Sequence, residues 1–278
     1  MALTGPDRVR FLHGMVTNDI KRLAVGHGCR AALLSQKGRF VADLIVYAHA
    51  DELWVETDRS TFAKVWEILS HHIIADDVEL VDRSGDFPLA GLYGFGSPLP
   101  VEVAPHVLVA HQGVLVAGTR ELGAPGLRIF GKNTLGDGVE RLSSEGFEMR
   151  RIEAGTPRYG LDMDEDRLFL EAGIEDAVSY DKGCYLGQEV VARAQSRGQL
   201  NRRLVGLLFD NQLPERGSKL ASADRPEAGF VTSAAFSTVL GRPVGLGYVH
   251  RTAWTPGTVL QCGNQSATVT ALPIVNYA

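Results

Sequence analysis

The sequence contains no long hydrophobic run. No stretch approaches the roughly 18 to 20 consecutive apolar residues that a membrane helix needs. The opening MALTGPDRVRF also lacks the apolar core of a signal peptide. These absences argue against a membrane partner and a secretory route, so we expect a cytoplasmic protein.

Basic residues are too few for a nucleic-acid-binding surface. The chain has 28 Lys and Arg against 33 Asp and Glu, which gives a net charge of −5 at pH 7. The charges are interspersed and form no basic stripe that could neutralise a phosphate backbone. We therefore expect no nucleic-acid partner.

Cysteine is scarce, with three residues at Cys29, Cys184 and Cys262 in a chain of 278. They lie far apart, and the sequence has no CxxC motif or Cys/His cluster. An odd number of distant cysteines argues against a disulfide framework, and the missing clusters argue against zinc or a self-contained iron–sulfur site. We expect free thiols in a reducing compartment and no resident metal.

The sequence does contain enough apolar residues, 45% of the chain, to form real cores. Apolar spacing predicts helices over residues 6–18 and 58–73, a hairpin of residues 30–35 and 40–48, and a strand at 53–57. Residues 78–130 predict a second small unit of strands, with a turn at Gln112-Gly113 and a helix over 134–144. This pattern indicates an α+β organisation.

After Leu200 the pattern changes to short strands separated by Gly, Pro and polar turns. Such spacing is typical of a small all-β barrel. We expect residues 1–199 to form two interleaved α+β subdomains and residues 200–278 to form the barrel. The boundary lies in the polar stretch 195–201.

Asp43 is the first candidate site residue. Strand alternation puts it on one face with Val41, Ile45 and Tyr47. A carboxylate among apolar neighbours is costly unless it is paired or hydrogen-bonded. Two interpretations remain open: a strand-end aspartate satisfied by the backbone or by Arg39, or a carboxylate that holds a ligand.

Cys184 is the second candidate, in the stretch KGCYLGQEVVAR at residues 182–193. Lys182 and a helix that starts after the cysteine would both raise the thiolate fraction of the thiol. The alternative is a cysteine that only packs, between glycines that form a tight turn. No histidine lies close in sequence, so a Cys–His nucleophile is not supported.

The stretch RRIEAGTPRYGLDMDED, residues 150–166, combines arginines with a run of acidic residues. The arginines could grip a carboxylate or a phosphate. The acidic run lacks the glycine and the bidentate glutamate of a calcium loop, so we expect a solvated turn there.

Together, FLHGMVTND, GRFVADLIVY, RRIEAGTPRYGLDMDED and NRRLVGL resemble the folate-binding family of the glycine-cleavage T protein, the aminomethyltransferase. The resemblance spans nearly the whole chain. KGCYLGQE is similar to the signature of the YgfZ-type branch, which the family associates with tetrahydrofolate-dependent maintenance of iron–sulfur proteins. The aminomethyltransferases carry a cysteine-free sequence at that place.

The resemblance implies a cloverleaf of two α+β domains and a C-terminal β-barrel around a channel that holds tetrahydrofolate. Asp43 matches the aspartate that contacts the pterin-side nitrogens and helps position or deprotonate the reacting amine. Tyr47 and Val55 match folate-lining positions, and Arg151 matches an arginine near the ligand. We also assign Lys182 and Tyr185, which flank Cys184, to the folate site.

Three departures from the family pattern bear on these expectations. Arg128 occupies a position where the transferases carry a glutamate that holds the pterin edge, and Thr57 one where they carry asparagine. Both put amine-transfer chemistry in doubt. Family chains also begin earlier, before the segment that is TGPD here, so we expect either a late start or a folate site that lacks part of one wall.

Three functional hypotheses follow. In the first, the protein binds tetrahydrofolate and supports assembly or repair of clusters in iron–sulfur client proteins, with Asp43 holding the folate and Cys184 as a reactive thiol. In the second, it is an aminomethyltransferase that moves a one-carbon unit from a lipoyl carrier to tetrahydrofolate. In the third, it is a non-catalytic folate-responsive scaffold. The resemblance favours a monomer.

Overall fold

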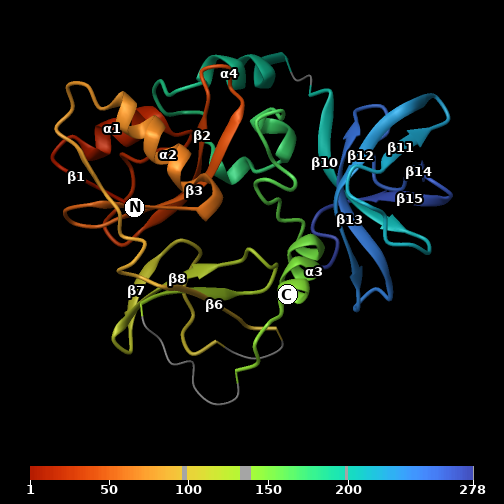
Figure 1. The fold of residues 1–278 in the computed structure, drawn as a ribbon, viewed down its shortest axis with the longest axis horizontal. Helices are drawn as coiled ribbons and strands as arrows, with labels where there is room; N and C mark the ends of the chain where they lie inside the picture. Colours follow the sequence, from red (N-terminus) through yellow and green to blue (C-terminus); the bar gives the residue numbers. More distant parts are fainter. Residues whose placement is uncertain (96–98, 132–138, 198–199, 278) are drawn as a thin grey trace.

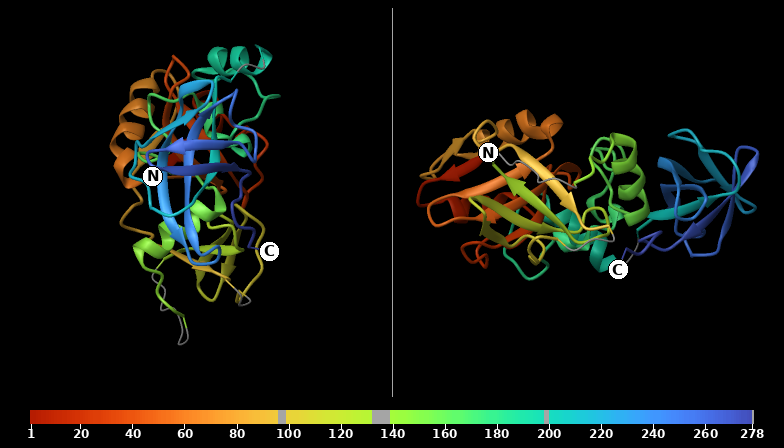
Figure 2. Two further views of the ribbon diagram at one scale, coloured as in Figure 1. Left: turned by 90° about the vertical axis from the view of Figure 1, so that its right-hand side faces the viewer. Right: turned by 90° about the horizontal axis from the view of Figure 1, so that it is seen from below.

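The computed structural model describes residues 1–95, 99–131, 139–197 and 200–277. Two α+β parts lie next to each other, and a β-barrel lies to one side of them, with helix α3 between (Figure 1). Seen from below, the barrel forms one end of an elongated molecule (Figure 2). The expected architecture of two α+β parts and a C-terminal barrel is confirmed.

The first part is built on a five-stranded sheet with the order β2-β3-β4-β1-β5. Its strands are β1 (Ala2–Thr4), β2 (Gly28–Leu34), β3 (Phe40–Ala48), β4 (Leu53–Thr57) and β5 (Glu79–Val81). Helices α1 (Arg8–Met15) and α2 (Arg59–His72) pack against it, and Leu12, Val65 and Leu69 share a core with Leu44 and Val46. Because side chains alternate along a strand, Asp43 and Ile45 point to the other side of the sheet.

The second part is a four-stranded sheet with the order β6-β9-β8-β7. Its strands are β6 (Leu89–Tyr93), β7 (Leu108–His111), β8 (Val114–Thr119) and β9 (Gly126–Phe130). Gln112 and Gly113 form the predicted turn between β7 and β8, both with positive φ.

The helix of this region starts later than the sequence predicted. Residues 132–138 lie outside the described residues, and residues 139–143 form no helix. Helix α3 runs over Ser144–Ala154, because the side chain of Ser143 accepts a hydrogen bond from the Gly146 amide and caps its first turn. The prediction of a helix over residues 134–144 is therefore wrong for its described residues before Ser144.

The segment between α3 and the barrel packs against the β2–β3 hairpin at the end where the two strands are connected. It contains the short helices η1 (Phe169–Ala172) and η2 (Glu175–Ala177), followed by α4 (Gln188–Arg197). Phe169, Tyr185 and Val191 of this segment share a core with Phe40 of the hairpin. The predicted helix after Cys184 is confirmed as α4.

The third part is a closed barrel with the strand order β10-β13-β12-β11-β14-β15. Its strands are β10 (Arg202–Phe209), β11 (Lys219–Ser222), β12 (Arg225–Ser237), β13 (Arg242–His250), β14 (Val259–Cys262) and β15 (Gln265–Thr270). Closure leaves no unpaired edge strand. The division of the chain at residues 199 and 200 stays a prediction.

Within the described ranges, no helix combines the length and the apolar character that crossing a membrane requires.

Candidate functional site

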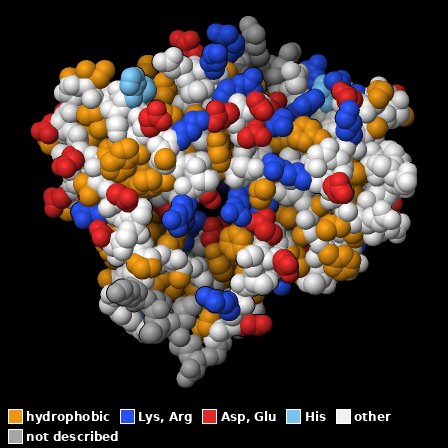
Figure 3. Space-filling model, in the orientation of Figure 1, with side chains coloured by type: hydrophobic (Ala, Val, Ile, Leu, Met, Phe, Trp, Pro, Cys, Tyr) orange, Lys and Arg blue, Asp and Glu red, His pale blue; other side chains and the backbone are white. Residues whose placement is uncertain are grey.

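A cavity of about 970 Å³ lies between the two sheets, the start of α3 and the loop that follows α3. Figure 3 shows a hollow near the centre of the molecule, with basic side chains at its rim. Its lining includes Asp43 and Arg151, two of the residues predicted from sequence. A cavity of this size can enclose a small organic ligand.

Asp43 forms an ion pair with Arg30 of the neighbouring strand β2. Arg30 Nε donates to Asp43 Oδ1 at 2.9 Å, and Arg30 Nη2 donates to Oδ2 at 2.7 Å. In the β2–β3 register Arg30 lies opposite Ile45, so it reaches Asp43 diagonally. Burial works against the charge of Arg30, but the ion pair with Asp43, with smaller contributions from Asp176 and Glu121, raises the pKa of the guanidinium overall.

Arg39, which the sequence offered as a partner for Asp43, lies elsewhere. Its Nη1 donates to the backbone carbonyl of Asp166. Arg39 is at the end of the hairpin connection, whereas Arg30 shares a sheet face with Asp43. The carboxylate is thus paired by a residue that the sequence interpretation missed.

A second set of charges crosses the cavity from one sheet to the other. Arg128 of β9 forms ion pairs with Glu56 of β4 and, at 2.6 Å, with Glu121, which also accepts a hydrogen bond from Tyr93. Burial raises the pKa of Glu121 and lowers the pKa of Arg128. The cation at the unusual position 128 is therefore neutralised by two carboxylates.

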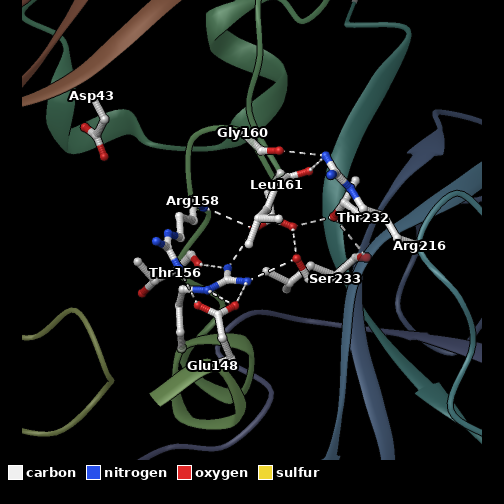
Figure 4. A network of polar contacts seen from close by, with 12 residues as sticks. Asp43, Glu148, Thr156, Arg158, Gly160, Leu161, Arg216, Thr232 and Ser233 are labelled. Atoms are coloured by element: carbon white, nitrogen blue, oxygen red, sulfur yellow. Dashed lines mark hydrogen bonds and ion pairs between the residues drawn. The ribbon is translucent and has the colours of Figure 1, made fainter. Parts of the chain in front are cut away.

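Arg151 is 3% exposed and belongs to a polar network. Figure 4 shows this network, with its members Glu148, Thr156 and Ser233 labelled. Nη1 donates to Asp162 at 2.6 Å and to the Thr156 carbonyl at 2.7 Å, while Nη2 donates to Ser233 of the barrel at 3.0 Å. Glu148 accepts from Nε at 3.1 Å and from Nη2 at 2.8 Å. All five N–H groups of Arg151 thus have partners.

Asp162 joins this network to the barrel. It is 1% exposed and accepts hydrogen bonds from Thr232 at 2.5 Å and Ser233 at 2.7 Å. The expectation of a solvated turn is wrong for Asp162, because its carboxylate is buried against Arg151 and the barrel hydroxyls. Asp43 lies apart from the network in Figure 4.

His106 is a further cavity residue that the sequence interpretation did not select. It has a φ of 61°, a left-handed conformation that is uncommon outside glycine. Burial lowers the pKa of its imidazole, so the ring is neutral at pH 7. Residues held in such conformations cluster at functional sites.

Tyr47 and Val55 lie behind the cavity surface. Tyr47 is fully buried between the two sheets, edge-on to Phe130 with ring centroids 5.5 Å apart. Burial raises the pKa of its phenol to about 12. Val55 is 1% exposed in the core beneath α1 and α2. Neither lines the cavity, and their assignment to the folate site stays a prediction.

The segment that carries Cys184 packs on the end of α1. Lys182 is 6% exposed, and its Nζ donates to the backbone carbonyls of His13 at 2.5 Å, Val16 at 2.6 Å and Asn18 at 2.9 Å. Tyr185 is buried, with its ring centre 5.0 Å from Lys182 Nζ. Cys184 itself is exposed.

Cys184, Lys182 and Tyr185 are not among the described residues that line the cavity. Lys182 is occupied by carbonyl groups and fixes the segment to α1. The predicted roles of these three residues stay predictions.

Comparisons with known proteins agree with this fold. Residues 1–98 match the model of the GCVT N-terminal domain, and residues 202–275 match that of the glycine cleavage T-protein C-terminal barrel domain. The crystal structure of the glycine cleavage system aminomethyltransferase T from Bartonella henselae superposes with a TM-score of 0.87. The superposition covers 99% of this chain and 83% of the Bartonella chain, with 22% sequence identity. At this identity it shows only that the two proteins share a fold.

Among curated relatives, an aminomethyltransferase of Pelodictyon phaeoclathratiforme is 30% identical over 281 residues, which is 89% of this chain and 76% of the relative. A putative chloroplastic transferase of Arabidopsis thaliana is 25% identical over 300 residues, which is 98% of this chain and 68% of the relative. The chain therefore belongs to the glycine cleavage T-protein family, that of the aminomethyltransferases.

Proposed function

We propose that the protein binds tetrahydrofolate in the cavity between its two sheets and transfers a one-carbon unit to it, as an aminomethyltransferase does. The observation that carries this proposal is the cavity of about 970 Å³ with the paired carboxylate of Asp43 on its surface. The relatives named aminomethyltransferase support it.

The cavity residues fit a folate in chemical terms. The pterin of a folate presents N–H groups, and carboxylates such as Asp43 and Glu121 can accept hydrogen bonds from them. Its glutamate tail presents carboxylates, which arginines such as Arg158 at the cavity surface bind. Tyr93 and Phe147 also line the cavity and offer ring faces.

In the proposed transfer, the aminomethyl group on a lipoyl carrier loses its amine as ammonia, its carbon–sulfur bond to the carrier breaks, and its carbon bonds to two nitrogens of tetrahydrofolate. The two protons that these nitrogens lose leave with the ammonia and with the freed thiol of the carrier. Asp43 would contribute by holding a folate nitrogen in place through a hydrogen bond. Such positioning lowers the barrier of a reaction between two bound groups.

Binding can be tested by anaerobic calorimetric titration of the purified protein with tetrahydrofolate. We expect micromolar affinity in the native chain and a loss of about tenfold or more in Asp43→Asn, because the amide lacks the anionic acceptor. Asp51→Asn, at an exposed turn of the same sheet, is the matched control and should bind like the native chain. No binding by the native chain would reject the proposal.

Transfer can be tested by the release of ammonia from an aminomethylated lipoyl carrier protein. We expect release that depends on both tetrahydrofolate and the native chain. If the native chain binds folate but releases no ammonia at saturating folate, the transferase activity is rejected and folate binding stands.

One observation favours a second candidate function. Cys184 is exposed within KGCYLGQE, the motif that is similar to the YgfZ-type signature, so its thiol can reach other proteins. We propose as the alternative that the protein uses folate and Cys184 to support iron–sulfur client proteins. Cys184→Ala in the host should then lower the activity of cluster-dependent enzymes, whereas Cys262→Ala, at a buried barrel position, should not.

If Cys184→Ala leaves those enzymes unchanged, an essential thiol is rejected. Should Cys184→Ser also be silent while folate alters the binding of a client, the scaffold hypothesis is supported instead. We further propose that the protein acts as a monomer, so light scattering should give the chain mass of 30.1 kDa.

A further inference from the structure

We infer that Arg30 is a positioning residue that holds the carboxylate of Asp43 in a fixed plane, so that Asp43 can accept hydrogen bonds from N–H groups of the ligand. This inference rests on the proposed binding of folate in the cavity. It assigns a role to Arg30, which the sequence did not single out.

The geometry of the pair carries the first step. Two nitrogens of Arg30 donate to the two oxygens of Asp43, at 2.9 and 2.7 Å. This forked arrangement fixes the plane of the carboxylate, because the planar guanidinium cannot follow a rotation without losing one bond. The backbone beneath is fixed as well, since Thr57 Oγ1 donates to the Asp43 carbonyl at 3.1 Å.

Burial carries the second step. The side chain of Arg30 is 15% exposed, and that of Asp43 is 27% exposed. Both residues line the cavity, and the side chain of Arg30 is the less exposed of the two, so Asp43 offers the larger accessible portion to a ligand. Each carboxylate oxygen can accept more than one hydrogen bond, so the oxygens paired with Arg30 can still accept from a ligand.

Charge carries the third step. Both hydrogen bonds of the pair join a guanidinium to a carboxylate, and hydrogen bonds between charged groups are stronger than those between neutral groups. Arg30 therefore holds Asp43 more firmly than a neutral donor would.

The surrounding groups leave the pair intact. Asp176 of η2 is the second carboxylate near Arg30, at 3.8 Å, and its side chain is 63% exposed. From the second sheet and its loops, Glu121, Arg128 and His106 face the pair. Arg128 is held by its own two carboxylates, and His106 is neutral at pH 7 because burial lowers its pKa.

The test uses Arg30→Gln, Arg30→Lys, Asp43→Asn and the double variant Arg30→Gln/Asp43→Asn in the full chain. Arg39→Gln is the control. It removes an arginine at the end of the same hairpin whose guanidinium donates to the backbone carbonyl of Asp166 and not to Asp43. Tetrahydrofolate affinity is measured anaerobically at neutral pH.

We expect Arg30→Gln to weaken binding by about tenfold or more, because a partly buried charge loses its partner. Arg30→Lys should be intermediate, since it keeps the charge and loses the fork, and Arg39→Gln should match the native chain. The double variant should bind no worse than Asp43→Asn.

Native-like affinity in Arg30→Gln would overturn the inference, and so would losses that add in the double variant, which would place Arg30 directly on the ligand. Circular dichroism of each variant checks that a loss of affinity does not come from unfolding. If the native chain binds no folate, the proposed function fails; if the native chain binds folate and Arg30→Gln binds it equally well, only the role of Arg30 is rejected.

Discussion

Lys182 is a buried ammonium group whose three N–H bonds all end on backbone carbonyls of the α1 end and the residues after it. Burial nevertheless lowers its pKa from 10.5 to about 8. Between these two values the native chain has released a proton that the unfolded chain keeps. Because the unfolded state binds more protons in this window, the free energy of unfolding rises with pH through the contribution of Lys182.

We therefore predict that the free energy of unfolding of the native chain, minus that of Lys182→Met, becomes more positive from pH 8 to pH 10. Urea denaturation of both proteins at pH 8, 9 and 10 measures this difference. Lys37→Met, at an exposed position of the β2–β3 connection, should show no such trend relative to the native chain. A constant difference for Lys182→Met would contradict the prediction.

At the scale of single residues, the sequence indicated that Asp43 needs a partner but did not identify Arg30. Strand alternation alone places Asp43 on a face. To find Arg30 one also needs the register between β2 and β3, which depends on an irregularity between Leu33 and Leu34. The burial of Asp162 does not follow from the local sequence for a related reason: it arises from barrel residues about 70 positions away.

At the scale of elements, the KGCYLGQE segment depends on only one of its two glycines for its shape. Gly187 has a φ of 82°, and a Cβ there would lie 2.5 Å from the backbone oxygen of Ser35. At Gly183 a Cβ would meet nothing within 4 Å, and its φ is not in the left-handed region. The turn before α4 therefore requires glycine at position 187 alone.

We predict that Gly187→Ala lowers the free energy of unfolding by about 2 kcal/mol or more, since alanine is strained in the left-handed region and would collide with a backbone atom. Gly183→Ala should change it by less than about 0.5 kcal/mol. Chemical denaturation of the two variants measures both values. Equal effects would show that the steric argument is mistaken.

Elements with a clear apolar period were predictable. The β2–β3 hairpin, helix α2 and the short barrel strands all follow from side-chain alternation or helical spacing. Helix α3 was placed too early, because its few apolar residues give a weak period and the capping residue Ser143 decides where it starts. The start of α3 thus depends on a local capping contact and not on the apolar period.

At the scale of the whole molecule, the buried pair of Arg151 and Asp162 connects the α+β parts to the barrel. Asp162→Ala should lower the free energy of unfolding by about 3 to 5 kcal/mol, because it leaves the nearly inaccessible Arg151 with one carboxylate fewer. Asp166→Ala, at an exposed position of the same loop, should change it by less than about 0.5 kcal/mol. Urea denaturation measures the free energy of unfolding of both variants. Similar values would refute the claim that the Arg151–Asp162 pair stabilises the contact with the barrel.

Tyr277 forms a second connection between distant parts of the chain. Its hydroxyl bonds Glu153 of α3, and the guanidinium of Arg150 lies 4.8 Å from the rings of both Tyr277 and Phe95. Tyr277→Ala should lower the melting temperature more than Tyr277→Phe, because alanine loses the ring contacts as well as the hydroxyl. Thermal unfolding of the two variants checks the order, and the reverse order would refute it.

The overall assembly of the cavity was not predictable from local sequence. Its surface combines β2, β3, β4, β9, the start of α3 and the loop around His106, which lie far apart in the chain. Asp43 and Arg151, which the family resemblance selected, both line this cavity, and their folate-binding role stays a prediction. Glu121, Arg128 and His106 come together only through the packing of the second sheet on the first.

The diagonal pairing of Arg30 and Asp43 also limits how the length of this chain can vary among related sequences. Register in a hairpin is set by its connection, and a slip of one residue turns every side chain of a strand to the opposite face. A single-residue insertion between Leu34 and Phe40 that shifted β2 against β3 would move Arg30 away from Asp43. Insertions at the Gln112-Gly113 turn would leave that pair in place, so length changes should be tolerated there and selected against in the first hairpin.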